Sequence, residues 1–300
     1  MDDLIEWNQA LRAGFSEHDV RTRVAAGDWV PLMRGWYAMR APQDEKDLHL
    51  MRLTAVLRAN GSRLVASHSS AALHWGLPMH DVDLSTVHVT FRKSDRRSKR
   101  RTRLHMHACP RRAFEPVDNA EHPAIATLQL ASLSFEAGLV AVDEALRRGL
   151  VDSEQLHRAE SVMGRCRSVE SIRQVVSQAD GRHESPGETL TAFQLRLAGI
   201  EVEPQFVIPG TERWTQSRHG YRADFRVKGE RVLIEFDGRS KYGRGVDVWQ
   251  EKQREDRIRS LDWGFVRPIW RDLLGVGRLA SMVREAVAYK RAGYRETPAS

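Results

Sequence analysis

Apolar and polar positions alternate most clearly near the C-terminal third of the chain, and this pattern predicts a β-hairpin. Two strand-like runs, 221–227 and 231–236, are joined by the short polar link Lys228-Gly229-Glu230. A link of this length between two such runs is typical of a hairpin. The flanking periodicities predict a helix between Ser185 and Gly199, a strand at 204–208, a helix at 246–261, a strand at 264–269 and a helix at 273–289.

The second run of the hairpin carries acidic residues at its end. Side chains alternate across a strand, so one face is predicted to hold Val232, Ile234 and Phe236 and the other Leu233, Glu235 and Asp237. Glu235 and Asp237 would lie about 6.5 Å apart and repel by roughly 2.5 kcal/mol at an effective dielectric near 20. Asp224 on the neighbouring strand adds a third charge. Carboxylates favour Mg²⁺ or Mn²⁺, so a metal site is one interpretation, and a solvated strand end near a turn is the other.

The first 43 residues predict a winged helix-turn-helix. A helix is predicted over 4–13, and a second over 17–26 with Ser16 as its N-cap and Gly27 as its stop. Two short strands around Arg34-Gly35 then form the wing. In this layout the second helix enters the major groove of DNA. Its exposed basic residues would be Arg21 and Arg23, with Arg34 on the wing; alternatively, the segment is a small helical module that docks on the next domain.

The middle of the chain predicts a mixed α/β scaffold without a catalytic constellation. Its predicted elements are a helix over 44–58, a strand at 63–67, a short helix near 70–77, a strand at 87–91 and helices within 122–149, 153–163 and 169–178. Residues 92–103, RKSDRRSKRRTR, are mostly Arg and Lys. This run is either a solvated hairpin tip or a loop that contacts phosphates, which would add affinity without sequence choice.

The charge balance favours a polyanionic partner. The 300 residues include 47 Lys plus Arg against 40 Asp plus Glu, a net charge of +7, and the isoelectric point is about 9.7. Such a balance suits nucleic acid or an anionic membrane surface. We expect no transmembrane segment, and the acidic start Met1-Asp2-Asp3 is unlike a signal peptide, so the expectation is a soluble cytoplasmic protein.

The cysteine pattern does not build a structural zinc site. Cys109 and Cys166 are the only cysteines and lack a CxxC partner. His105, His107 and Cys109 alternate onto one predicted strand face and could touch a metal, but no fourth ligand is evident nearby. An ordinary strand with two exposed histidines is the other interpretation.

Residues 13–39, AGFSEHDVRTRVAAGDWVPLMRGWYAM, resemble the N-terminal domain of AbiEi-type antitoxins and their actinobacterial relatives. The match lies in Gly27, Trp29 and the Arg-Gly-x-Tyr-Ala wing formed by residues 34–38. The chain begins so close to this motif that the first of the family's three helices is shortened or absent. The middle region is similar to the same group. The resemblance implies an operator-binding regulator or antitoxin with a cognate toxin or defence partner.

Residues 184–275 resemble the very-short-patch-repair (Vsr-like) branch of the PD-(D/E)XK nuclease superfamily. The motifs, in order, are SPGE, AD, IEFDG followed by KY, EKxRED and WGFVR. The resemblance implies that Asp224 and Glu235 bind the metal, with Asp237 and Glu188 completing the site. Glu188 also fits an S-x-x-E capping box.

This chain departs from the superfamily at one position. The residue two after the metal-binding Glu is often Lys, whereas this chain has Asp237. The resemblance then assigns the catalytic positive charge to Lys241 or to Lys252, and places Arg254 on an adjacent phosphate. The implied reaction is metal-assisted phosphodiester hydrolysis.

The predicted fold class is α+β. It comprises a winged-helix-like module at 1–43, a mixed α/β domain at 44–180 and a restriction-endonuclease-like domain with a mixed sheet at 181–300. The predicted function is a Mg²⁺- or Mn²⁺-dependent nuclease whose partner is double-stranded DNA. The alternatives are a DNA-binding regulator with a non-catalytic nuclease fold, and an interaction protein whose charge only aids solubility.

Overall fold

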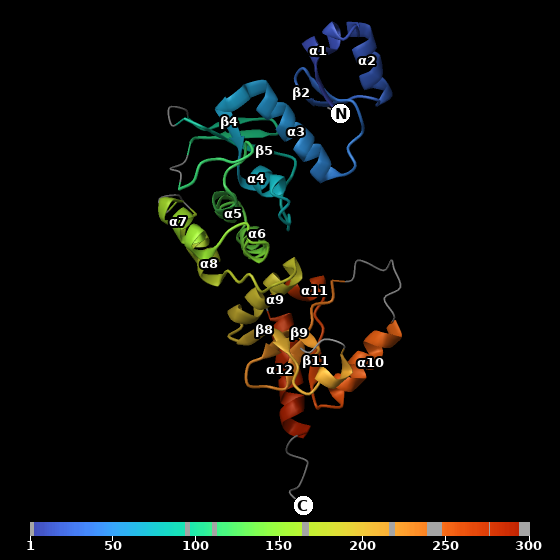
Figure 1. Ribbon diagram of the computed structural model, residues 1–300, viewed down its shortest axis with the longest axis vertical. Helices are drawn as coiled ribbons and strands as arrows, with labels where there is room; N and C mark the ends of the chain where they lie inside the picture. Colours follow the sequence, from blue (N-terminus) through green and yellow to red (C-terminus); the bar gives the residue numbers. More distant parts are fainter. Residues whose placement is uncertain are drawn as a thin grey trace, which may run out of the picture. The chain divides into compact units, whose positions relative to one another are not determined.

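The computed structural model describes residues 3–93, 97–109, 113–163, 168–215, 220–238, 248–275 and 277–293. The chain forms two compact units, 1–179 and 180–300 (Figure 1). Each unit combines helices with its own sheet or sheets, and the α+β class is confirmed.

The N-terminal module contains two helices and a three-stranded antiparallel sheet. Its elements are β1 (Leu4–Glu6), α1 (Trp7–Arg12), α2 (Glu17–Ala26), β2 (Val30–Met33) and β3 (Trp36–Ala38), with strand order β1-β3-β2. The helix predicted over 4–13 was therefore wrong in its first turn. Leu4 and Ile5 are buried and pair with Ala38 and Tyr37, so a distant strand partner outweighs local helical preference. Ser16 forms the predicted N-cap through a capping box with Asp19.

The rest of the first unit is a mixed sheet with helices on both faces. The elements are α3 (Glu45–Asn60), the 3₁₀ turn η1 (Gly61–Arg63), β4 (Leu64–Ala66), α4 (His68–His74), β5 (Val87–Phe91), β6 (Lys99–Arg101), β7 (Leu104–His107), α5 (Pro123–Ala131), α6 (Phe135–Arg147), α7 (Ser153–Met163) and α8 (Val169–Gln178). The strand order is β4-β5-β7-β6, and β5 and β7 are parallel. Val87, Val89 and Met106 pack against Leu53 and Val56 of α3.

The second unit is a four-stranded mixed sheet with order β11-β10-β9-β8. Its elements are α9 (Pro186–Leu197), β8 (Val202–Val207), the 3₁₀ turn η2 (Glu212–Trp214), β9 (Arg222–Val227), β10 (Val232–Ile234), α10 (Val248–Arg259), β11 (Gly264–Val266), α11 (Trp270–Leu273) and α12 (Arg278–Gly293). The strands β8, β9 and β10 are antiparallel, whereas β10 and β11 are parallel. Ile258 of α10 is fully buried in a cluster with Leu233 and Trp263.

The C-terminal helix predicted over 273–289 begins later than predicted, because α12 spans Arg278–Gly293 and only Leu273 of the predicted range belongs to the short α11. The Asp272 carboxylate accepts a hydrogen bond from the Ile269 N–H at 3.0 Å, which caps the short α11. Gly277, with φ of +104°, then turns the chain before α12 begins. Apolar residues stand on both sides of this turn, which is why the sequence pattern places the helix start too early.

Within the described part of the chain, no helix combines the length and the apolar character needed to cross a bilayer.

Candidate functional site

Asp224 and Glu235 face each other across the β9–β10 hairpin. Leu233 pairs with Arg226 and Ile234 with Phe225, so the next pair in this register is Glu235 with Asp224. Just beyond the end of β10 the two segments remain in contact, because the Phe236 N–H donates to Asp224 Oδ2 at 2.7 Å. Two carboxylates are thus held side by side at the end of the hairpin.

The backbone after β10 stays extended along β11. The Glu235 N–H donates to the Val266 carbonyl at 3.0 Å, and the Asp237 N–H donates to the Pro268 carbonyl at 2.9 Å. Residues two apart in extended backbone project to the same side. Asp237 therefore shares a face with Glu235, in agreement with the alternation read from the sequence.

The carboxyl group of Asp224 is electrostatically disfavoured in its charged form. Burial, the negative charge of Glu188 and the negative charge of Glu235 together raise the pKa of Asp224 to about 7, against the lowering effect of the Phe236 N–H. A cation beside Asp224 would offset this penalty. The chemistry of the group therefore fits a metal ligand.

Glu188 joins this cluster from the first turn of α9. Its side chain is 6% exposed. The Glu188 N–H donates to Ser185 Oγ at 3.2 Å, so the predicted N-cap is present. The Glu188 carboxylate accepts from the Ser185 hydroxyl at 2.8 Å and from the Glu184 N–H at 2.9 Å. Glu188 thus serves the helix start and also faces Asp224.

Gln205 lies beside the cluster of Asp224, Glu235 and Glu188, and nothing in the sequence marked it as a site residue. The β8–β9 register, in which Pro204 pairs with Phe225 and Phe206 with Ala223, puts Gln205 opposite Asp224. Gln205 Nε2 donates to Glu188 Oε2 at 2.8 Å, and its φ of +54° is unusual for a residue other than glycine. Strained backbone of this kind is often found at functional sites, which favours a role for Gln205 in positioning Glu188.

Gly187 explains how α9 can lie so close to the hairpin end. A Cβ atom at Gly187 would lie 2.0 Å from Cε1 of Phe236. The Phe236 ring also packs edge-on against Trp270, with ring centroids 5.0 Å apart. The SPGE segment therefore requires glycine for packing, and this packing brings Glu188 to the acids.

Glu235 is neutralised by two arginines of its own unit. Arg254 Nη2 lies 2.5 Å from Glu235 Oε1, and Arg267 Nη2 lies 3.4 Å from Oε2. Both guanidinium groups also contact Glu251. Arg254, predicted as a phosphate ligand, is therefore engaged by the acid cluster. Arg267, the arginine of the WGFVR segment, was not predicted as a site residue.

The carboxylate oxygens do not converge as closely as metal ligands do. Among the described residues, three histidines of the first unit are the one group of three or more His, Cys, Asp or Glu whose ligand atoms all lie within 4.8 Å. Glu235 is drawn toward Arg254, and Asp224 toward the Phe236 N–H. A metal ion held by Asp224 and Glu235 must therefore displace the Arg254 guanidinium.

Of the two predicted catalytic lysines, the structure describes only Lys252. Lys241 is outside the described residues. Lys252 is exposed on α10, whereas Glu251, Arg254 and Glu255 on the same helix are partly buried.

The basic residues predicted for DNA binding in the N-terminal module are exposed. Arg21 forms an ion pair with Glu17 at 3.3 Å. The Arg23 guanidinium lies over the ring of Phe15, 5.2 Å from its centroid. Arg34 lies at the β2–β3 turn. Arg21 and Arg23 thus remain candidates for phosphate contacts but already have local partners.

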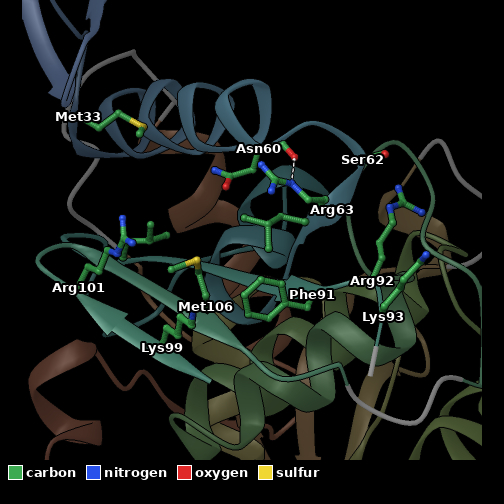
Figure 2. A pocket seen from close by; sticks show the side chains of 12 residues that line it. Met33, Asn60, Ser62, Arg63, Phe91, Arg92, Lys93, Lys99, Arg101 and Met106 are labelled. Carbon is green, nitrogen blue, oxygen red and sulfur yellow. Dashed lines mark hydrogen bonds between the residues drawn. The ribbon is translucent and has the colours of Figure 1, made fainter. Parts of the chain in front are cut away.

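A basic groove on the first unit was only partly predicted. It has a volume of about 780 Å³ and is lined by the cationic side chains of Arg63, Arg92, Lys93, Lys99 and Arg101. Figure 2 shows Lys99 and Arg101 on one side and Arg92 and Lys93 on the other, with Phe91 and Met106 between them. Four of the five cations belong to the basic run 92–103, of which residues 94–96 lie outside the described part. Arg63 comes from the chain segment before β4.

No protein-family model matches the chain. It is 25% identical over 260 residues to the Uncharacterized protein Rv2248 of Mycobacterium tuberculosis strain H37Rv, which covers 84% of this chain and 91% of the relative. The values are the same for the Uncharacterized protein MT2308 of M. tuberculosis strain CDC 1551. Among solved structures, the RV2827C protein from M. tuberculosis aligns with a TM-score of 0.41 and 16% identity, over 68% of this chain and 78% of that chain. None of these names states an activity.

Proposed function

We propose that this protein is a metal-dependent nuclease whose active site lies at the end of the β9–β10 hairpin. The observation that carries the proposal is the juxtaposition of Asp224, Glu235 and Glu188, which raises the pKa of Asp224 to about 7. A like-charge cluster of this kind is costly unless a cation relieves it. The order of elements, α9, three antiparallel strands, α10, β11 and a C-terminal helix, supports the Vsr-like resemblance.

Asp224 and Glu235 would hold Mg²⁺ or Mn²⁺, with Asp237 and Glu188 completing the site. When bound, the ion supplies an activated water and polarises the scissile phosphate. Gln205 holds the Glu188 carboxylate in place. Arg254, once displaced from Glu235, is positioned to pair with the phosphate that carries the negative charge.

The proposed substrate is DNA. The net charge of +7 and the basic groove on the first unit support a polyanionic ligand. In this proposal the five cations of the groove contact phosphates, which adds affinity without sequence choice.

The test is cleavage of supercoiled plasmid and labelled single-stranded DNA and RNA with Mg²⁺, Mn²⁺ or EDTA. The variants are Asp224→Asn and Glu235→Gln. Glu203→Gln is the matched control, since Glu203 lies on the same sheet and pairs with Arg226 instead. We expect the wild type and the control to cleave in a metal-dependent way. We expect the cleavage rate of the two site variants to fall at least a hundredfold while they remain folded. Equal residual cleavage in all variants would refute the assignment.

A second candidate function is DNA binding without cleavage, as in a regulator or antitoxin. It is favoured by the neutralisation of Glu235 by Arg254 and Arg267, which gives the acids a structural role without any metal. Salt-dependent binding of duplex DNA without cleavage under any metal condition would select this function. In that case the exposed Arg21 and Arg34 become the residues to test against an operator.

A further inference from the structure

Four histidines gather on the face of the first unit's larger sheet that lies opposite α3. His88 and Thr90 of β5 share this face, as do His105 and His107 of β7, and the register pairs His88 with His105 and Thr90 with His107. His68, the first residue of α4, lies against them. The cluster thus unites three elements that are separate in the sequence.

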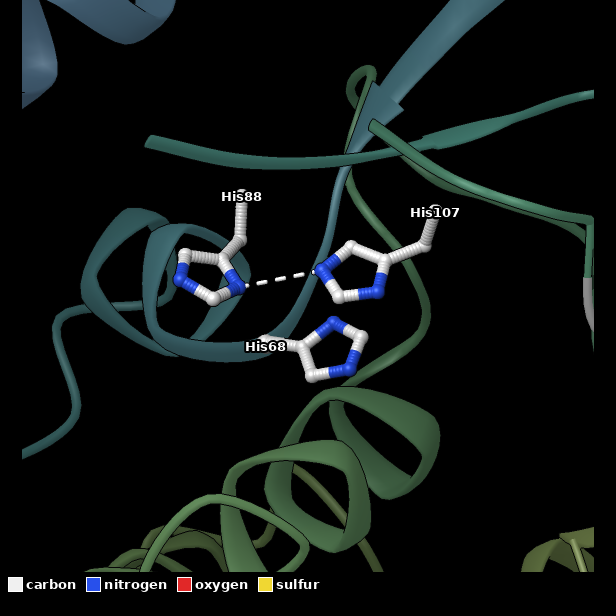
Figure 3. A group of neighbouring side chains, drawn as sticks. All are labelled: His68, His88 and His107. Atoms are coloured by element: carbon white, nitrogen blue, oxygen red, sulfur yellow. Dashed lines mark hydrogen bonds between the residues drawn. The ribbon is translucent and has the colours of Figure 1, made fainter. Parts of the chain in front are cut away.

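Three of these rings bring nitrogen atoms together. One ring nitrogen each of His68, His88 and His107 lies within 4.8 Å of the others. His88 Nδ1 lies 3.0 Å from His107 Nε2 (Figure 3). The His68 ring stacks on that of His107, with centroids 3.9 Å apart and an interplanar angle of 17°.

The environment keeps these imidazoles neutral, which is the form that binds metals. His68 is 9% exposed and His88 8% exposed. Burial, reinforced by the neighbouring histidines, lowers the pKa of His88 to about 4 and that of His107 to about 3. Each neutral ring therefore carries one lone pair at neutral pH, and a metal ion would replace the proton that His88 Nδ1 and His107 Nε2 share in their hydrogen bond.

The surroundings hold His68 in an uncommon conformation. Its φ is +48°, in the left-handed region that non-glycine residues rarely adopt. Its backbone N–H donates to Gln129 Oε1 at 3.0 Å, and its Nδ1 lies 3.1 Å from Ser67 Oγ. When Nδ1 donates to Ser67, Nε2 carries the free lone pair, as in metal sites whose ligand histidines are oriented by a second hydrogen bond.

A polar group on the same face lacks a partner. Among the described residues, the Thr90 hydroxyl is fully buried and makes no hydrogen bond. Buried hydroxyl groups are normally satisfied by protein or ordered water. A water molecule on a metal ion bound by the histidine cluster would supply the missing hydrogen-bond partner of Thr90.

We propose that His68, His88 and His107 form a binding site for a divalent transition-metal ion of the zinc class. Three imidazoles and one water make a four-coordinate site, with the water on the face that carries Thr90. In a tetrahedral site with bonds of about 2.0–2.1 Å the ligand nitrogens lie about 3.3 Å apart, close to the observed 3.0 Å between His88 and His107. A metal lies in the plane of each ring that it binds, so the His68 ring rotates out of its stack on His107.

This site differs from the histidine–cysteine set suggested by the alternation of His105, His107 and Cys109. The Cys109 thiol donates to the Arg92 carbonyl at 3.3 Å, whereas His107 turns toward His68 and His88. The proposed site also differs in metal preference from the acidic cluster. Imidazole nitrogen favours zinc, copper, nickel and cobalt, whereas carboxylate oxygen favours magnesium and manganese.

The experiment measures Zn²⁺ binding to the metal-stripped full-length chain by calorimetry and equilibrium dialysis, in the presence of excess Mg²⁺. The variants are His107→Gln and His88→Gln. His74→Gln is the control on α4, where His74 is exposed, and Asp224→Asn excludes a contribution from the acidic cluster. Circular dichroism verifies that each variant is folded.

In the expected result, the wild type and both controls bind one Zn²⁺ tightly per chain. Both site variants bind Zn²⁺ at least tenfold more weakly. Co²⁺ replacement in the wild type gives an independent measurement that needs no variant, because a tetrahedral nitrogen site produces intense visible absorption bands. The absence of a stoichiometric Zn²⁺ site in the wild type, or of a tetrahedral Co²⁺ spectrum, would overturn the proposal. So would full retention of Zn²⁺ by His88→Gln and His107→Gln.

Discussion

The Arg254 guanidinium donates to Glu235 Oε1 over 2.5 Å, and this ion pair joins α10 to the acidic end of the β9–β10 hairpin. The side chains are 20% and 15% exposed, so water screens them only partly. The positive charge of Arg254 offsets the mutual repulsion of the carboxylates of Asp224, Glu235 and Glu188. It also competes with any metal for the same carboxylate, and this competition makes the function testable.

Replacement of Arg254 by Gln separates these two effects. We expect stability to fall by about 1–3 kcal/mol, because Glu235 keeps only the weaker contact with Arg267. We also expect tighter Mg²⁺ binding, because the competing cation is gone, together with slower cleavage. Urea unfolding and Mg²⁺ titration measure both changes. Arg259→Gln on the same helix, where Arg259 pairs with Glu255 near the surface, is the control and should leave Mg²⁺ affinity unchanged.

The pKa of Asp224 predicts how stability depends on pH. Between about pH 4 and 7 the folded chain keeps a proton on Asp224, whose pKa is about 7, whereas the unfolded chain has lost it. The folded state then binds more protons, so this group makes stability fall as pH rises through that window. In EDTA, Asp224→Asn should therefore gain about 1–3 kcal/mol over wild type by pH 7.5 and little at pH 4, allowing for partial exposure. A variant that is destabilised equally at every pH would contradict this account.

The Gly187–Phe236 contact predicts a large effect from a single methyl group. Glycine to alanine inside a helix usually stabilises by up to about 1 kcal/mol. Here the new Cβ would lie 2.0 Å from the Phe236 ring, so Gly187→Ala should instead destabilise by about 1–3 kcal/mol. Gly275→Ala is the control, since a Cβ there meets no atom within 4 Å. In a double-mutant cycle, Phe236→Leu should recover part of the loss, and simple additivity would argue against the clash.

The histidine cluster predicts acid sensitivity in the first unit. Below pH 6.5 the unfolded chain protonates its histidines, whereas His88 and His107 stay neutral in the folded state until about pH 4 and about pH 3. The unfolded state then binds more protons, so stability is lost as pH falls from 6.5 toward 4, by up to about 1.4 kcal/mol per pH unit for each histidine. Urea unfolding in EDTA at pH 7.5, 6 and 5 should show a shallower loss for His107→Gln than for wild type. His74→Gln should follow wild type.

The basic groove predicts which arginines and lysines contact phosphates. Each lost phosphate contact lowers the slope of log affinity against log salt by about 0.9. Lys99→Gln combined with Arg101→Gln should therefore reduce the slope for duplex DNA by about 2, as measured by fluorescence anisotropy. The matched double variant Arg21→Gln with Arg23→Gln tests the N-terminal module. A reduced slope in that variant alone would move the interface from the groove to α2.

Local sequence rules determined the elements whose causes are short-range. The hairpin follows from a polar three-residue link between strand-like runs, and β9 and β10 form on either side of it. Ser16 and Ser185 cap their helices because each is followed three residues later by an acidic side chain. The alternation after Ile234 also placed Glu235 and Asp237 on one side of the chain, since side-chain direction in extended backbone depends only on parity.

Tertiary structure decided the features that depend on distant partners. Leu4 and Ile5 became strand rather than helix because β3 offers a pairing edge more than thirty residues away. The sequence contains no sign that Gln205 would hold Glu188, or that Arg254 and Arg267 would neutralise Glu235. His68 joins His88 and His107 only because α4 begins above the β5–β7 face. Sequence patterns report the direction of a side chain, whereas the charge or ligand that it meets depends on how separate elements pack.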